Sequence, residues 1–425
     1  MDAAGSAVPP ASVLDEAFAT LRGAAFGNPH SANPSSVRTT AKIRAARDRV
    51  AAFFGTTTDE YAVVFTANAS AGLRIVADAF AWEDGSSVLA HTLQCHTSVL
   101  GMRAVAIDRG ASLRVLEPPE VDEYLDQALG GPASGPSLFV WPGECNFAGT
   151  KYPLEWGSRI VAAAEDGQDG GGDDDDDEGK PCARWYSLLD ASKLASAAAV
   201  DLSATPADFV VCSVYKIIGY PSGVGILLIR RAAASVLSSR RFFGGGTVAA
   251  TASSQLFHAL APTLHERFED GTLAFLDIAT LPIGLDWIDR TLGGMDRIGA
   301  HTCALAAFVR SVLGGLRHHN GLPVVVIHAD HAFPVGPVVN FSVLDAAGEP
   351  VGYAEVGRLA SLAGFHVRTG RFCNAGACEA FLGITPDLVR ANYAAGHVCR
   401  NTAVREQSVV RPSVACIVMG WEGDF

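Results

Sequence analysis

The 425-residue chain lacks the features that mark membrane, secreted and nucleic-acid-binding proteins. No apolar run approaches the roughly 20 residues needed to span a bilayer, and the N-terminus lacks the basic-then-apolar pattern of a signal peptide. The nine cysteines are odd in number and scattered, which excludes the paired framework of a small secreted domain. Lys and Arg number 32 against 45 Asp and Glu, and the net charge of −13 disfavours binding to nucleic acid. We therefore expect a soluble, cytoplasmic protein with neither a membrane nor a nucleic-acid partner.

Apolar residues are abundant, at 49% of the chain against 18% charged residues, so the protein can bury a large core. The chain exceeds the length at which a single core stops growing, which predicts more than one domain. Short apolar runs alternate with helical patterns, as is typical of an α/β protein with a mixed, mostly parallel sheet. We predict a large domain over residues 1–285 and a smaller α+β domain over residues 286–425. A helix is expected at 41–54, and strands are expected at 61–66, 87–90, 137–141, 187–190, 209–214, 224–229, 324–327 and 338–343.

A low-complexity acidic stretch interrupts the α/β pattern ahead of the expected strand at 187–190. Residues 165–178 contain nine Asp and Glu and no Lys or Arg. Such a tract repels itself and buries little apolar surface, so we expect residues 165–180 to form a disordered surface insertion. Docking of a basic partner on this tract is the alternative interpretation.

Two charged residues at the ends of apolar strands indicate a cofactor. Lys216 follows the apolar run 208–215 and precedes a Gly-rich turn at 219–225, while Asp190 ends the apolar run that starts at Trp185. Burial of an amine lowers its pKa and makes it nucleophilic toward an aldehyde, and a carboxylate keeps a pyridine nitrogen protonated. Alone, each residue is more typical of a solvated sheet rim. Together they predict a site for pyridoxal 5′-phosphate, with Lys216 forming the Schiff base.

The turn at residues 67–73 is consistent with a phosphate-bearing cofactor. Its small residues open a helix directly after the expected strand at 61–66. Backbone amides at such a helix N-terminus bind phosphate groups. The turn supports the prediction of a cofactor site, but without Lys216 it would be too weak a signal to predict one.

A Gly-rich loop at residues 367–378 contains Cys373 and Cys378 beside two arginines. Nearby positive charge favours the thiolate form of a cysteine, so Cys373 is a candidate nucleophile toward a substrate sulfur. The flanking glycines favour a mobile loop. A zinc site is the rival interpretation, although a second pair of ligands at suitable spacing is missing and we predict no metal. A buried, inert thiol is the remaining alternative for either cysteine.

Several motifs in order give the chain a more specific resemblance. Segments 27–36, 146–154, 190–196, 208–225 and 368–374 together resemble the aminotransferase-like domain of molybdenum cofactor sulfurases, and the match runs nearly end to end. The resemblance implies a class V, fold-type I pyridoxal-phosphate enzyme. It also implies that the enzyme takes sulfur from L-cysteine, leaves alanine and passes the sulfur to the molybdenum cofactor.

The resemblance also implies a role for each matching residue. Lys216 would hold the cofactor, Cys373 would carry the persulfide, and Asp190, His96 and Asn146 would contact the pyridine nitrogen, the ring face and the phenolic oxygen. The expected phosphate contacts are Ala69, Ser70 and Ser213, with Thr247 of a neighbouring subunit, and the expected contacts to the substrate carboxylate are Arg368 and Asn28. Because Thr247 would act across subunits, we expect a homodimer.

Three functions are compatible with these residues. The first is a molybdenum cofactor sulfurase. The MOSC domain that holds the acceptor in this family is not expected in this sequence, so the sequence is either a fragment or is served by a separate chain with that domain. The second is a stand-alone cysteine desulfurase or selenocysteine lyase that serves other sulfur acceptors. The third is a pyridoxal-phosphate-binding scaffold without turnover. Retention of Lys216, Asp190, His96 and Cys373 together disfavours the scaffold, since a scaffold has no need of all four.

Overall fold

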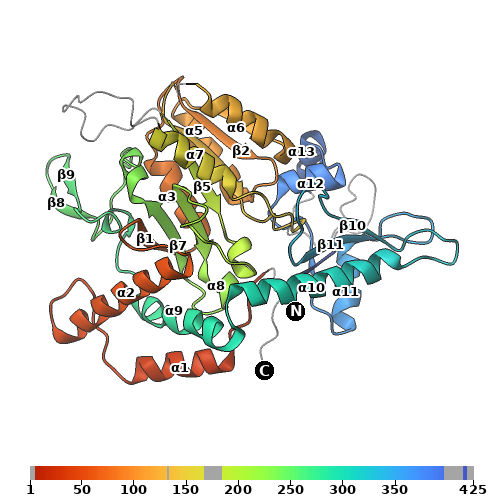
Figure 1. The fold of residues 1–425 in the computed structure, drawn as a ribbon, viewed down its shortest axis with the longest axis horizontal. Coiled ribbons are helices and arrows are strands. Elements are labelled where there is room, and N and C mark those ends of the chain that lie inside the picture. Colours follow the sequence, from red (N-terminus) through yellow and green to blue (C-terminus); the bar gives the residue numbers. More distant parts are fainter. Residues whose placement is uncertain (1–4, 132–133, 167–183, 397–414, 419–425) are drawn as a thin grey trace.

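A computed structural model describes residues 5–131, 134–166, 184–396 and 415–418 of the chain. Its larger part is built on a seven-stranded sheet in the order β1-β7-β6-β5-β4-β2-β3 (Figure 1). The strands are β1 (Tyr61–Thr66), β2 (Val88–Thr92), β3 (Ser112–Leu116), β4 (Ser137–Pro142), β5 (Trp185–Asp190), β6 (Phe209–Ser213) and β7 (Gly225–Arg230). Only β7 runs against its neighbours β1 and β6, so the sheet is mixed and mostly parallel, as predicted.

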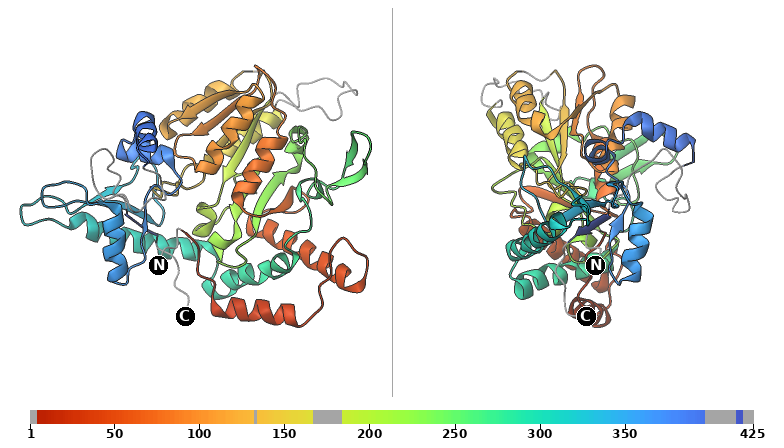
Figure 2. Two further views of the ribbon diagram at one scale, coloured as in Figure 1. Left: turned by 180° about the vertical axis from the view of Figure 1, so that it is seen from behind. Right: turned by 90° about the vertical axis from the view of Figure 1, so that its right-hand side faces the viewer.

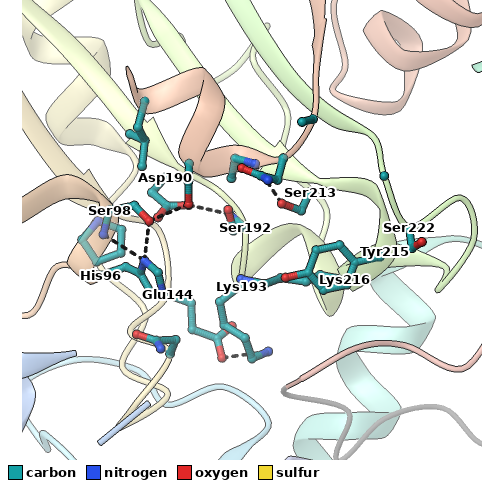
Figure 3. A pocket seen from close by; sticks show the side chains of 18 residues that line it. His96, Ser98, Glu144, Asp190, Ser192, Lys193, Ser213, Tyr215, Lys216 and Ser222 are labelled. Atoms are coloured by element: carbon teal, nitrogen blue, oxygen red, sulfur yellow. Dashed lines mark hydrogen bonds and ion pairs between the residues drawn. The ribbon is translucent and has the colours of Figure 1, made fainter. Parts of the chain in front are cut away.

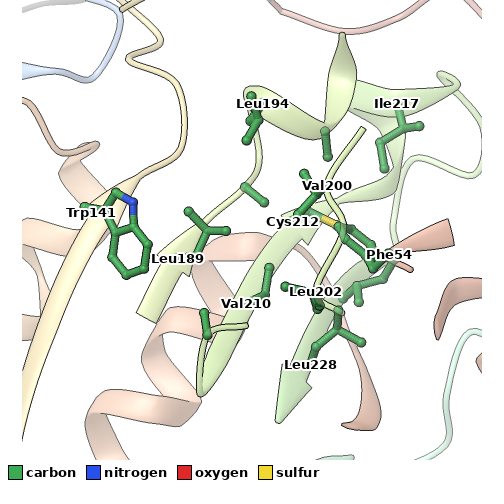
Figure 4. Close-up of a cluster of buried hydrophobic side chains, with 14 of the residues drawn as sticks. Phe54, Trp141, Leu189, Leu194, Val200, Leu202, Val210, Cys212, Ile217 and Leu228 are labelled. Atoms are coloured by element: carbon green, nitrogen blue, oxygen red, sulfur yellow. The ribbon is translucent and has the colours of Figure 1, made fainter. Parts of the chain in front are cut away.

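Helices cover both faces of this sheet, because successive strand residues point to opposite sides. In β1, Val63 and Phe65 face one core cluster and Val64 faces the other. The first cluster includes residues of α2 (Pro34–Phe53), α6 (Val121–Leu129), α7 (Glu155–Asp166) and α9 (Phe275–Trp287), and part of it is drawn in Figure 4. The second includes residues of α3 (Ala69–Ala79), α4 (Thr97–Leu100) and α5 (Met102–Asp108). The near-continuous apolar runs of the central strands reflect this burial on two faces.

A smaller part of the chain follows, with an antiparallel sheet in the order β10-β11-β13-β12. Its strands are β10 (Val325–His328), β11 (Val338–Val343), β12 (Arg368–Thr369) and β13 (Ala415–Val418). Its helices are α11 (Tyr353–Leu362), α12 (Ala375–Leu382) and α13 (Pro386–Ala394). Figure 2 shows these elements beside the edge of the larger part where the strands β2, β4 and β5 end.

Helix α10 (Met295–Gly315) connects the two parts (Figures 1 and 2). Its first turn places Met295 and Ile298 in the core of the larger part, whereas Ala306 belongs to the core of the smaller one. By length and composition alone this helix could cross a bilayer, and 17% of its most apolar 18-residue stretch is buried in the protein. The expectation that no apolar segment reaches that length was therefore wrong for residues 295–315.

The remaining described elements lie outside the two main sheets. Helix α1 (Ala11–Arg22) packs on α9, and the hairpin of β8 (Val248–Ala252) and β9 (Phe257–Leu260) projects from the larger part (Figure 1). Val214, expected to close a strand, begins α8 (Val214–Ile217) instead, and the expected ends at 87–90, 137–141, 187–190, 224–229 and 324–327 differ from the observed strands by one or two residues. Residues 167–180 of the expected acidic insertion lie outside the described ranges, while residues 165 and 166 end α7.

Candidate active site

A cavity of about 410 Å³ lies where five strands of the large sheet end (Figure 3). Strands β1, β2, β4, β5 and β6 each lead into a loop or helix that contributes to its wall. This edge is the usual ligand site of open α/β sheets, and the volume suits a small cofactor with its substrate. The residues that line it are Ala67, Asn68, Ala69, Ser70, Leu73, His96, Ser98, Pro142, Glu144, Asn146, Asp190, Ser192, Lys193, Ser213, Tyr215, Lys216, Ser222 and Gly223.

Lys216 enters this cavity from the one-turn helix α8, directly after β6. Burial lowers the pKa of its amine, and the neighbouring Asp190 carboxylate opposes that shift. The charges of Arg368 and Lys193 lower the pKa further. The lowered pKa increases the unprotonated fraction relative to an exposed lysine, and the unprotonated amine is the form that attacks an aldehyde carbon.

Asp190 is the last residue of β5 and lies beside β6, where it pairs in register with Val211. Its carboxylate is 8% exposed and accepts a hydrogen bond from the backbone amide of Ser192 at 3.0 Å. Because β5 and β6 are adjacent and parallel, Asp190 and Lys216 reach the same cavity from neighbouring strand ends. The structure therefore places Lys216 and Asp190 in one cavity, as the sequence predicted.

His96 caps the N-terminus of α4 with its imidazole ring. The backbone amide of Ser98 donates to its Nδ1 atom at 3.1 Å, so the ring proton of the neutral form is on Nε2. Burial lowers the pKa of His96, Asp190 opposes that shift, and the charges of Lys216 and Arg368 add to it. The ring is therefore neutral near pH 7 and is held in one orientation at the wall of the cavity.

Hydroxyl groups and backbone amides surround the end of the cavity at the N-terminus of α3. The amide of Ala69 donates to Ser213 Oγ at 2.9 Å, and Ser70 Oγ lies 2.6 Å from Ser98 Oγ. The chain approaches closely here, because a Cβ atom on Gly225 would lie 2.4 Å from the backbone carbon of Asn68. An eleven-residue helix that points its first amides into a hydroxyl-lined cavity suits a phosphate group. With Lys216 and Asp190 in the same cavity, the residues present fit pyridoxal 5′-phosphate.

The Cys373 loop of the smaller part is docked against this edge by hydrogen bonds. The backbone amide and Oγ1 of Thr97 both donate to the carbonyl of Cys373, at 2.7 and 2.8 Å. Asn146 Nδ2 donates to the carbonyl of Phe372 at 2.7 Å. In this conformation the backbone carbonyls of Phe372 and Cys373 are both anchored, and the mobility expected of the loop stays a prediction.

Local strain and packing expose Cys373 while its neighbours are buried. Phe372 and Cys373 have φ values of +52° and +55°, which non-glycine residues rarely adopt. The Phe372 ring is 5% exposed and packs 5.6 Å from the ring of Phe147, whereas Cys373 is exposed. Cys378 is 1% exposed within α12, so the two cysteines of the loop have opposite surroundings. Across the described residues no group of three or more His, Cys, Asp or Glu side chains is placed to hold a metal ion.

Four predicted site residues do not line the cavity: Cys373, whose loop is described above, and Arg368, Asn28 and Thr247. Arg368 lies on β12 with its guanidinium 5.4 Å from the Phe372 ring, close enough to influence the pKa of Lys216. Asn28 is exposed and accepts a hydrogen bond from the amide of His30. Thr247 is buried and donates to the carbonyl of Gly244 at 2.8 Å. The cofactor and substrate roles predicted for these residues stay predictions.

The sequence analysis missed two charged residues that line the cavity, Glu144 and Lys193. Their side chains form an ion pair of 3.3 Å, and both residues are almost fully buried. Lys193 lies within the segment 190–196 that carried the resemblance, and its position three residues after Asp190 is a signal that could have identified it. Ser98, Ser192 and Ser222 are further lining residues that were not predicted.

Comparison with known proteins agrees with this geometry. Molybdenum cofactor sulfurases of Bos taurus, Homo sapiens and Arabidopsis thaliana are 39%, 40% and 34% identical to the chain, each over 94% of its length. The match covers 45%, 45% and 51% of those proteins, so the chain spans about half the length of the curated relatives it matches. The resemblance drawn from the motifs is thereby confirmed.

Solved structures share the fold. A cysteine desulfurase of Thermococcus onnurineus superposes with a TM-score of 0.70 at 20% identity, covering 93% of each chain. One from Escherichia coli gives 0.69 at 20% identity and covers 90% of this chain and 86% of its own. The fold-type I architecture predicted from the motifs is confirmed. The sequence model of the family Aminotransferase class-V matches residues 1–129 and 182–416, and the chain belongs to this family.

Proposed function

We propose that the protein is a pyridoxal-phosphate-dependent L-cysteine desulfurase of the molybdenum cofactor sulfurase type. One observation carries the proposal: a loop with an exposed cysteine is docked at the mouth of a cavity that combines Lys216 with Asp190. The names of its relatives, of which it spans about half, support the same activity.

The residues of the cavity divide the work. Pyridoxal phosphate supplies an electron sink for the bonds at the substrate Cα atom when it is bound. Lys216 would hold the cofactor and, once displaced by the substrate amine, would be the base that accepts the Cα proton. Asp190 would contact the ring nitrogen and His96 the ring face, while Arg368, from outside the cavity lining, would bind the substrate carboxylate.

Sulfur transfer falls to Cys373. Its thiolate forms an S–S bond to the substrate sulfur while the Cβ–S bond of the substrate breaks. The electron pair of that bond stays with the substrate carbon, which is protonated and released as alanine. The products are alanine and a persulfide on Cys373, so atoms and electrons balance.

The first test is alanine release from L-cysteine by the protein loaded with pyridoxal phosphate, beside Cys373→Ala. We expect turnover in the wild type and at most residual turnover in the variant, with a persulfide on Cys373 detected by mass spectrometry. Turnover that is unchanged in Cys373→Ala would contradict the role of this cysteine. No turnover in the wild type would favour the scaffold.

The acceptor that we propose is the molybdenum cofactor, presented by a MOSC-domain partner. The names of the relatives are the support for this choice. Parallel transfer assays with molybdenum cofactor and with an iron–sulfur scaffold protein test it, and selenocysteine is assayed as a competing substrate. Preferential transfer to the scaffold protein, or faster turnover of selenocysteine, would favour the second candidate function.

We also propose a homodimer and a cytoplasmic location. The hairpin β8–β9 and the chain before it expose Phe242, Leu256 and Phe257, with Leu256 fully exposed, and a second copy would cover such apolar surface. Thr247 lies directly before this hairpin but is buried in the single chain, so this segment would have to rearrange for Thr247 to act across subunits. Analytical ultracentrifugation tests the dimer, and microscopy of a tagged chain tests the location. A monomer at micromolar concentration, or a membrane-bound signal, would refute the respective proposal.

A further inference from the structure

Two lysines, not one, line the cofactor cavity. Lys216 projects from α8, and Lys193 projects from the loop after β5 (Figure 3). A primary amine in either position is chemically able to bond to the aldehyde carbon of pyridoxal phosphate, with the aldehyde oxygen leaving as water. The family role implied for Lys216 does not by itself explain what would keep Lys193 from reacting in its place.

The two lysines differ in their acidic partners. Lys193 Nζ lies 3.3 Å from Glu144 Oε1 and donates to Ser196 Oγ at 3.2 Å, and Lys193 is 5% exposed. Within the described part of the chain, Lys216 has no carboxylate at ion-pair distance. An amine that keeps its proton has no lone pair for attack, so the pairing separates a reactive lysine from an unreactive one.

Glu144, which makes this contact with Lys193, lies in the wall of the cavity. It is 1% exposed, and among the described residues neither carboxylate oxygen has a hydrogen-bond partner of good geometry. Gly336 closes over it, because a Cβ atom there would lie 2.7 Å from Glu144 Oε1. Burial raises the pKa of Glu144, while the charges of Lys193, Lys151 and Arg310 oppose the rise. Burying the Glu144 carboxylate in the cavity wall costs free energy, because the group loses its contact with water and gains one close cation. Such a cost indicates a functional reason for the residue.

We propose that Glu144 selects the cofactor-binding lysine by holding Lys193 as an ammonium ion that cannot attack the aldehyde. Glu144 and Lys193 are thus positioning residues of the cavity, and Lys216 remains as the free nucleophile. The inference rests on the proposed use of pyridoxal phosphate, and it concerns residues that the family comparison does not assign.

Borohydride trapping tests the selection directly. Each protein is loaded with pyridoxal phosphate, reduced with sodium borohydride so that the cofactor becomes permanently attached to the lysine that holds it, and mapped by peptide mass spectrometry. We expect label on Lys216 alone in the wild type and little label on Lys193 in Lys216→Ala. In Lys216→Ala/Glu144→Gln we expect label on Lys193 to rise about tenfold or more, because the ammonium ion loses the carboxylate at 3.3 Å and about 1.4 kcal/mol of lost stabilisation is a factor of ten. Adding Lys193→Met to that variant should remove the label.

The outcomes separate this inference from the proposed function. Label on Lys216 in the wild type with equal label on Lys193 in Lys216→Ala and Lys216→Ala/Glu144→Gln would overturn the selection by Glu144 only. No label on Lys216 in the wild type would overturn the proposed cofactor use itself. If the Glu144→Gln variants do not fold, Lys216→Ala is labelled from about pH 7 to about pH 10, toward the ordinary lysine pKa. Label on Lys193 should then rise with pH, and a pH-independent yield would refute the ammonium state.

Discussion

Asn374 is the buried side chain on which docking of the Cys373 loop depends most. Its Nδ2 group donates to the carbonyl of Gln94 and to Asn146 Oδ1, both at 2.9 Å. Its Oδ1 atom accepts from the amide of Ala377 at 2.9 Å and caps α12. The residue is fully buried, so Asn374→Ala leaves these groups without a partner where water does not reach. We predict that the variant binds cofactor but loses sulfur transfer to Cys373.

The size of the effect follows from the three contacts. Loss of a helix cap costs about 1 kcal/mol, and each buried group left unsatisfied costs about 1–3 kcal/mol. Movement of the loop lets water reach the unsatisfied groups and relieves part of this cost. We expect the docked position of the loop to be destabilised by the remaining part, about 2–3 kcal/mol. Because about 1.4 kcal/mol corresponds to a factor of ten, persulfide formation on Cys373 should fall by about 30- to 160-fold. The packing of Gly376 against Leu93 still limits the movement, since a Cβ atom on Gly376 would lie 1.8 Å from the Leu93 carbonyl oxygen.

Single-turnover persulfide formation, followed by mass spectrometry of Cys373, measures the effect, with cofactor absorbance as the readout of the cavity itself. Asn374→Asp separates the two functions of the side chain, since a carboxylate still caps α12 but cannot donate to Gln94 and Asn146. Thr385→Ala is the matched control, because Thr385 caps the next helix, α13, through the amide of Leu388. A wild-type rate in Asn374→Ala, or an equal loss in Thr385→Ala, would refute the reasoning.

Three further predictions concern cofactor retention, stability and pH. Asp190→Ala should weaken retention of pyridoxal phosphate on dialysis, whereas a retained cofactor spectrum would contradict its contact with the ring nitrogen. Glu269→Gln should cost about 3–5 kcal/mol in urea unfolding, because it leaves Arg47, paired at 2.7 Å, as an uncompensated buried charge; a loss no larger than that of the exposed-pair variant Asp387→Asn would refute this. Burial lowers the pKa of His265 to about 4, below that of the unfolded chain near 6.5. Between pH 4 and pH 6.5 the unfolded state therefore binds a proton at His265 that the folded state does not. The free energy of unfolding of the wild type should fall as the pH drops from 6.5 to 4, and it should fall less steeply in His265→Gln.

Local signals were sufficient to predict the strands and the two residues at their ends. Strand β1 has the predicted limits, and β11 does too, because short apolar runs bounded by turn residues are buried on both faces in this fold. Lys216 and Asp190 were recognisable for the same reason, since a charged residue that ends a buried run must face either solvent or a ligand. Their distance in sequence did not matter, because adjacent parallel strands bring their carboxyl ends together.

Contacts between distant segments could not be predicted in the same way. Glu144 and Lys193 follow β4 and β5, and only the order of those strands in the sheet makes them neighbours. The docked state of the Cys373 loop depends on Thr97, which lies 276 residues away in the sequence. Glycines around the cysteine indicated freedom of the backbone, but hydrogen bonds from another part of the chain override that local preference.

The charges of the cavity wall explain why the cavity suits the positively charged ring of a protonated pyridine. Of the side chains that line the cavity, Glu144 and Lys193 compensate each other. Burial lowers the pKa of Lys216, which favours the neutral, reactive form of the amine. Burial likewise lowers the pKa of His96, which leaves that ring neutral. Asp190 is a buried carboxylate among these lining residues, and a ligand that brings one positive charge on a flat ring is a natural complement to it. The phosphate of the same ligand would be met by amides and hydroxyls instead of lysines, so Lys193 is the one lining amine that could compete with Lys216 for the aldehyde.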